Sequence, residues 1–152
     1  MHPSFEHIVR DLPASLTKLL ACEPISGGAP LPAGTPSRAV YLFTENGTHL
    51  YVGRTNRLRQ RYREHLSGRN NDAPFAFKLA RHETGLFKAK GMPTRKALEQ
   101  DPGFYLAFQR AKARVGYMEF RYVEEIDDYR QCLLEIYATV ELAAQFNDFA
   151  NH

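Results

Sequence analysis

The chain has 152 residues, of which 43% are hydrophobic and 24% charged, as in an ordinary globular protein with a core. Two cysteines, Cys22 and Cys132, are too few for a disulfide scaffold. The sequence has neither a signal-peptide pattern nor an apolar stretch long enough to span a bilayer. We therefore expect a cytoplasmic protein with buried, reduced thiols.

The charge is unevenly distributed along the chain. Residues 54–96 carry twelve Lys and Arg against three Asp and Glu, a net charge of +9, whereas residues 116–152 have a net charge of −6. A basic middle segment attracts a polyanion such as nucleic acid. An ordinary solvated helical surface has the same composition, so charge alone leaves both interpretations open.

The N-terminal part is predicted to be a helical extension. Apolar residues recur at helical spacing over residues 5–21, and Pro13 interrupts them, which predicts two short helices or a kink. Residues 23–37 are rich in Pro, Gly and Ala and are typical of a linker. We expect residues 1–37 to be this extension and residues 38–152 to form the main domain.

The main domain is predicted to begin with a β-hairpin. Residues 39–44 and 49–53 are rich in β-branched and aromatic side chains, and they flank Asn46-Gly47, a strong turn signal. Thr55 or Asn56 can cap a helix that continues to about Leu66.

The rest of the domain is predicted to be mainly helical, with one more strand. Helices are expected over residues 74–81, 94–100, 103–114 and 129–144, and a third strand over residues 117–126. The last helix is apolar on more than one side, so we expect it to be buried over most of its surface. The predicted fold class is α+β, a small three-stranded antiparallel sheet flanked by helices, with inserted helices before the third strand.

Polar and aromatic residues at fixed spacing give this chain a family resemblance. Ala39-Val40-Tyr41 is followed ten residues later by Tyr51-Val52-Gly53. The motif continues in order with Arg61 and His65, then with Glu135 in a predicted helix, and then with Asn147 downstream. This arrangement resembles the GIY-YIG nuclease family and covers most of the chain. Ala39 replaces the first glycine of the motif and valine replaces both isoleucines, which are substitutions that suit a strand.

The resemblance implies a site for phosphodiester hydrolysis. Glu135 is expected to bind one Mg²⁺ or Mn²⁺, since Mg²⁺ needs few carboxylates and keeps much of its water. Tyr41 or Tyr51 would orient or deprotonate the attacking water, and Arg61 would stabilise the transition state. His65 could share the role of base, and Asn147 would help to organise the site.

DNA is the expected partner. The residues expected to contact it lie in or beside the basic segment and are Arg54, Arg57, Arg63, Arg69 and Lys78. We expect no membrane association.

The register of the hairpin tests the nuclease interpretation. A two-residue turn at Asn46-Gly47 with regular pairing places Tyr41 and Tyr51 on opposite faces of the sheet. A three-residue loop with Gly47 in a bulge places them opposite each other on one face. The interpretation therefore predicts the bulged loop or an equivalent bulge elsewhere.

Three functions are compatible with these patterns. The leading hypothesis is a metal-dependent DNA endonuclease. The second is a nucleic-acid-binding module of the same fold without turnover, and the third is a protein-interaction domain that uses the N-terminal amphipathic segment.

Overall fold

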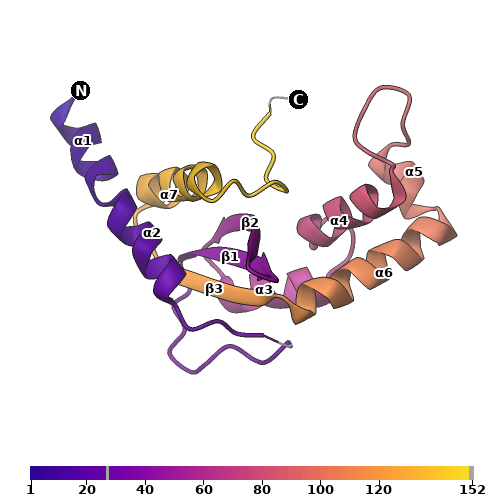
Figure 1. Cartoon of the computed structure of the whole chain (residues 1–152), viewed down its shortest axis with the longest axis horizontal. Helices are drawn as coiled ribbons and strands as arrows, with labels where there is room; N and C mark the ends of the chain where they lie inside the picture. Colours follow the sequence, from indigo (N-terminus) through magenta and orange to yellow (C-terminus); the bar gives the residue numbers. More distant parts are fainter. Residues whose placement is uncertain (27, 151–152) are drawn as a thin grey trace. The chain divides into compact units, whose positions relative to one another are not determined.

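The computed structural model describes residues 1–26 and 28–150 and divides the chain into two compact units (Figure 1). The first unit comprises Met1–Arg59 and Met118–His152, and the second comprises Gln60–Tyr117. The elements of the first unit are α1 (Pro3–Arg10), α2 (Leu12–Ala21), β1 (Ala39–Glu45), β2 (Thr48–Thr55), β3 (Glu119–Glu124) and α7 (Asp128–Glu141). The second unit contains α3 (Leu58–Ser67) from Gln60 onward, α4 (Pro74–Thr84), α5 (Arg95–Glu99) and α6 (Pro102–Tyr117).

The three strands form an antiparallel sheet in the order β2-β1-β3. Val40, Leu42 and Val52 project from one face, where they pack with leucines of α2 and with Leu134 and Ala138 of α7. We call this the helical face. Tyr41, Phe43, Tyr51 and Phe120 project from the opposite face, the aromatic face. The predicted α+β class, with a three-stranded antiparallel sheet flanked by helices, is confirmed.

The hairpin combines a tight turn with a bulge inside the second strand. Asn46 and Gly47 both have positive φ, 50° and 79°, and close a two-residue turn that pairs Glu45 with Thr48. The pairing then passes from Thr44–His49 to Phe43–Tyr51, which leaves Leu50 as the additional residue of a bulge. The expected three-residue loop is therefore wrong. The bulge lies elsewhere, as the alternative allowed, and it places Tyr41 and Tyr51 on one face, where they are opposite Gly53 and Phe43 rather than opposite each other.

The N-terminal helices are part of the first unit. The two predicted short helices are present and meet at Asp11, and Pro13 lies in the first turn of α2, where proline is tolerated. The α2 helix packs against the sheet and α7 through Leu12, Leu16 and Leu19. The following segment is anchored at Ile25, whose backbone exchanges two hydrogen bonds with Phe120 of 2.9 and 2.8 Å.

The second unit is built on α4 and α6. The Phe77 ring of α4 packs against Phe104 and Phe108 of α6, with ring centroids 4.9 and 5.8 Å apart. The Arg95 guanidinium stacks on Phe77, 3.9 Å from the ring centroid. The predicted inserted helices before the third strand thus have a small aromatic core of their own.

Two smaller expectations need correction. Ile136 and Val140 of α7 are exposed, the latter by 71%, so this helix buries one side rather than most of its surface. Cys22 and Cys132 are free, as expected, but they are half-buried rather than buried. Within the described part of the chain, no helix has both the length and the apolarity needed to cross a membrane.

Candidate active site

The two motif tyrosines lie together on the aromatic face. Their ring centroids are 6.4 Å apart, and Tyr41 also packs against Phe43 at 6.0 Å and Phe120 at 5.5 Å. Tyr41 is 1% exposed, whereas Tyr51 is half-buried. The Leu50 bulge produces this arrangement, because without it Tyr51 would point to the helical face. The sequence pattern therefore yields a pair of neighbouring phenols.

Gly53 makes room for the side chain of Tyr41. These residues pair across β1 and β2, and the Tyr41 ring lies over the glycine. A Cβ on Gly53 would be 2.3 Å from both Cζ and the hydroxyl oxygen of Tyr41. The last residue of the Tyr51-Val52-Gly53 triplet thus has a steric role, because any side chain there would displace the Tyr41 hydroxyl.

Glu135 lies on α7 and forms an ion pair with Arg54 of β2. The Arg54 Nε donates to Glu135 Oε2 over 2.9 Å, and the glutamate side chain is 18% exposed. Arg54 is two residues beyond Val52 and shares the helical face with it. Glu135 therefore lies beside the edge strand β2, next to Arg54.

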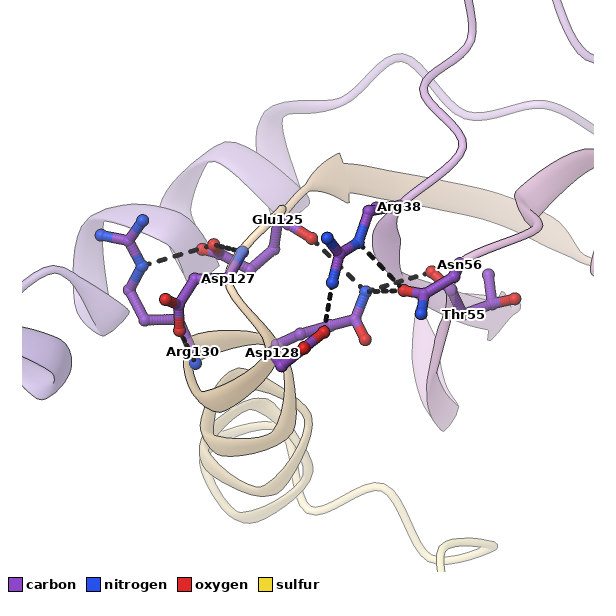
Figure 2. Close-up of polar contacts among 8 residues, drawn as sticks. Arg38, Thr55, Asn56, Glu125, Asp127, Asp128 and Arg130 are labelled. Carbon is purple, nitrogen blue, oxygen red and sulfur yellow. Dashed lines mark hydrogen bonds and ion pairs between the residues drawn. The ribbon is translucent and has the colours of Figure 1, made fainter.

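A polar network fixes the start of α7 to the strand ends (Figure 2). The buried Gln131 donates to the Thr55 carbonyl at 3.1 Å and to Asn56 Oδ1 at 3.2 Å. Arg38 forms an ion pair with Asp128. Gln131 is one helical turn before Glu135, so its bonds to the end of β2 orient the turn that carries the glutamate.

The cap of α7 adds to this network. Asp127 caps the helix by accepting from the Arg130 amide at 2.9 Å. The buried Glu125 forms an ion pair with Arg130, with Nε and Oε1 3.3 Å apart, and accepts from the Asp127 amide at 3.1 Å. The helix therefore begins at a defined point relative to the sheet.

Asn147 binds the outer edge of β2. Its Oδ1 accepts from the Val52 amide at 2.9 Å, and its Nδ2 donates to the Val52 carbonyl at 2.7 Å. The neighbouring Phe146 amide donates to the Leu50 carbonyl at 3.1 Å. The side-chain amide thus pairs with the edge as another strand would, and it holds the peptide groups on either side of Val52, the residue that follows Tyr51.

Arg61 and His65 lie one turn apart on α3, in the second unit. Arg61 Nη1 donates to Glu64 Oε2 and to the Asp72 carbonyl, both at 3.0 Å. His65 is fully buried. Burial, and then the neighbouring Arg61 guanidinium, hold the pKa of His65 well below its ordinary value of 6.5, so its imidazole is neutral at pH 7.

The comparison with protein families identifies the family of this chain. A family model described as the GIY-YIG catalytic domain matches residues 38–144, more than half of the chain. The chain belongs to the GIY-YIG family. Neither the curated proteins nor the solved structures include one with a significant match. The family match ends before Asn147, so the role of that residue depends on its contacts with β2.

The buried histidine of this GIY-YIG domain is expected to make stability depend on pH. In the unfolded chain, His65 binds a proton near pH 6.5, whereas in the folded chain its imidazole stays neutral down to a lower pH. The unfolded state then holds more protons below pH 6.5, so the free energy of unfolding falls as the pH falls. We expect His65→Gln to reduce the slope of the free energy of unfolding against pH by up to about 1.4 kcal/mol per pH unit. Urea unfolding at a series of pH values below 6.5 measures this slope.

The control for this measurement is His7→Gln, since His7 is exposed on α1. His49, whose pKa is also lowered chiefly by burial, is expected to leave a residual slope in the His65→Gln variant. Equal slopes in wild type and His65→Gln would show that His65 is not held neutral by the fold.

The expected metal can be compared with the side chains of the GIY-YIG domain. Among the described residues, no group of three or more His, Cys, Asp or Glu could hold an ion. Mg²⁺ is commonly held by one or two carboxylates, with waters and substrate phosphate completing its shell. Glu135 fits such a site, because a carboxylate that accepts from Arg54 through one oxygen has further lone pairs to offer.

The residues expected to bind DNA differ in their surroundings. Arg57, Arg63 and Arg69 are exposed, and Lys78 is half-buried. Arg54 is exposed but is bonded to Glu135, so its immediate role is to hold that carboxylate.

Three functional contributions were missed in the sequence. The close contact of Gly53 with Tyr41 and the ion pair of Arg54 with Glu135 depend on the register and leave no sequence signal of their own. Gln131 did leave a sequence signal, because a polar residue on the same helical stripe as the apolar Leu134 and Ala138 indicates a buried polar contact.

Proposed function

We propose that this protein is a metal-dependent endonuclease that hydrolyses phosphodiester bonds in DNA. The observation that carries the proposal is that Tyr41 and Tyr51 are neighbours on one face, with ring centroids 6.4 Å apart, and that Gly53 leaves space for the Tyr41 hydroxyl. A tight turn without the bulge would have separated the phenols, and an alanine at position 53 would have displaced one of them. Membership of a nuclease family supports the same activity.

The proposed catalytic residues are Tyr41, Tyr51, Arg61, His65, Glu135 and Asn147. Hydrolysis adds water across a P–O bond, so a proton must leave the water and another must reach the leaving oxygen. A phenol with an ordinary pKa near 10 is a poor base at pH 7 but a good hydrogen-bond donor and acceptor. We therefore assign Tyr41 or Tyr51 to orienting the water. His65 would share the role of base, and its burial, which lowers its pKa, makes it a weaker proton acceptor than an exposed histidine.

The other residues would bind charge or position the site. Arg61 would stabilise negative charge on the phosphoryl oxygens. Asn147 is a positioning residue, because it holds the β2 peptides on either side of Val52, next to Tyr51. Glu135 would hold Mg²⁺ or Mn²⁺, which supplies Lewis-acid stabilisation of the phosphate when bound.

The charge of the second unit supports a nucleic-acid substrate. Gln60–Tyr117 contains twelve Lys and Arg against five Asp and Glu, a formal net charge of +7, whereas the first unit has a net charge of −4. Such a concentration of positive charge favours binding to a phosphate backbone. The proposed contacts are Arg54 and Arg57 of the first unit and Arg63, Arg69 and Lys78 of the second.

A cleavage assay tests the proposal directly. The purified chain is incubated with duplex, single-stranded, flap and branched DNA in Mg²⁺, in Mn²⁺ and in a chelator. We expect cutting of at least one substrate with metal and none with chelator. Salt-sensitive binding without cleavage of any substrate would instead support a non-catalytic binding module.

A further inference from the structure

The second unit contains a cleft of about 370 Å³ between the α3–α4 connection, the end of α5 and α6. Its apolar lining comes from Leu98, Phe104 and Phe108, all of which are buried. Tyr105 stands at the cleft and is 57% exposed. The volume is in the range of small-ligand sites, and an exposed aromatic ring beside an apolar floor suits a flat ring system.

Polar groups surround this apolar floor. Arg69, Asn70, Gln109 and the carboxylate of Glu99 line the cleft. Within residues 1–26 and 28–150, the side chains of the first three form no hydrogen bond with the protein. Gln109 is one helical turn after Tyr105, so an amide and an aromatic ring share one face of α6. An amide can both donate to and accept from the edge of a nucleobase, and a guanidinium can bind a phosphate.

Two cations hold the connection that carries Arg69 and Asn70. Lys112 of α6 donates to the Gly68 carbonyl at 3.1 Å while its ammonium lies 4.7 Å from the centroid of the Phe108 ring. Arg95 donates to the Asn70 carbonyl at 2.7 Å. The segment is therefore fixed before any ligand binds, which reduces the entropy lost on binding.

From this geometry we infer that the cleft binds one unpaired nucleotide of the DNA substrate. Tyr105 stacks on the base, Asn70 and Gln109 bond to its edge, and Arg69 contacts the adjacent phosphate. The inference rests on the proposed function, and the charge of +7 on this unit favours a nucleic acid over an uncharged ligand. It narrows the substrate class to DNA with a single-stranded segment or an extruded base, because a base stacked within a duplex cannot reach the cleft.

The test compares binding of single-stranded and duplex DNA by variants of the full chain. Fluorescence anisotropy with labelled oligodeoxynucleotides is measured in chelator, so that cleavage cannot interfere. We expect Tyr105→Ala to weaken binding of the single strand about tenfold, Tyr105→Phe to retain it, and neither to change duplex binding by more than about twofold.

The matched control is Tyr117→Ala, which removes a tyrosine that is 80% exposed at the end of the same helix. Its affinity for the single strand should equal that of the wild type. Equal affinity of Tyr105→Ala and wild type for the single strand would overturn the inference while leaving the proposed function intact. An equal loss for single strand and duplex would also overturn it, since general charge rather than stacking would then account for binding. Failure of the wild type to bind any DNA would overturn both proposals.

Discussion

Glu135→Gln is expected to abolish metal-dependent DNA cleavage while the chain stays folded. A glutamine keeps an oxygen that can accept from Arg54, so the contact between α7 and β2 survives. It loses the negative charge that a divalent cation needs. Metal stabilisation of a phosphoryl oxygen contributes several kcal/mol, so the cleavage rate in Mg²⁺ should fall about a thousandfold.

The control for this substitution is Glu141→Gln. Glu141 is an exposed carboxylate at the end of the same helix, and its loss should leave the cleavage rate unchanged. Urea unfolding of both variants shows whether the fold is retained. A Glu135→Gln protein that cuts at the rate of the wild type would remove Glu135 from the metal site.

Gly53→Ala should impair cleavage through the position of one hydroxyl group. The new methyl group would be 2.3 Å from the Tyr41 hydroxyl and Cζ, well inside van der Waals contact. Packing against Phe43 and Phe120 limits how far the ring can move. We expect the cleavage rate to fall about a hundredfold or more and the free energy of unfolding to fall by about 1–3 kcal/mol.

Two further variants separate the catalytic effect of Gly53→Ala from its effect on stability. Tyr41→Phe removes only the hydroxyl, so it should lose most of the cleavage while retaining the aromatic packing. Gly116→Ala is the matched glycine control, because its Cβ would meet Leu66 at an ordinary 3.7 Å. This substitution lies in α6, where alanine is the better helix former, so it should leave the cleavage rate unchanged and should not lower the free energy of unfolding. Full activity of Gly53→Ala would show that the Tyr41 position does not limit the reaction.

The elements of the fold could largely be predicted because local signals specified them. Asn46-Gly47 supplied two residues that adopt positive φ, and the turn formed there. Pro13 marked the division between α1 and α2, although it lies inside the first turn of α2 rather than between the helices. Periodicity could not predict how α7 is buried, because Ile136 and Val140 have the same apolar character as the residues that face the sheet.

The bulge at Leu50 could not be predicted from the hydrophobic pattern. Residues 39–44 of β1 are buried on both faces, so this strand does not alternate between apolar and polar side chains. In β2, Leu50, Tyr51 and Val52 are all apolar or aromatic, so a shift by one residue leaves the pattern intact. Only the requirement that two tyrosines share a face favoured a bulge, and that requirement came from the family resemblance.

The site was predicted as a set of residue types, and the structure adds the contacts that orient them. Arg54 was predicted only as a DNA contact, and the structure adds its bond to the carboxylate of Glu135. Such a pair depends on α7 crossing the end of β2, a contact between residues 81 positions apart in the chain. Sequence spacing carries no information about contacts of this kind.

The two bonds between Asn147 and Val52 have a consequence for shortened forms of this protein. Without them, the amide and carbonyl of Val52 at the sheet margin would be open to a strand from another molecule. The segment matched by the family model ends at residue 144 and therefore does not include Asn147, which forms these bonds. Chains truncated at that boundary would therefore tend to self-associate through β2, even if every catalytic group before residue 144 were retained.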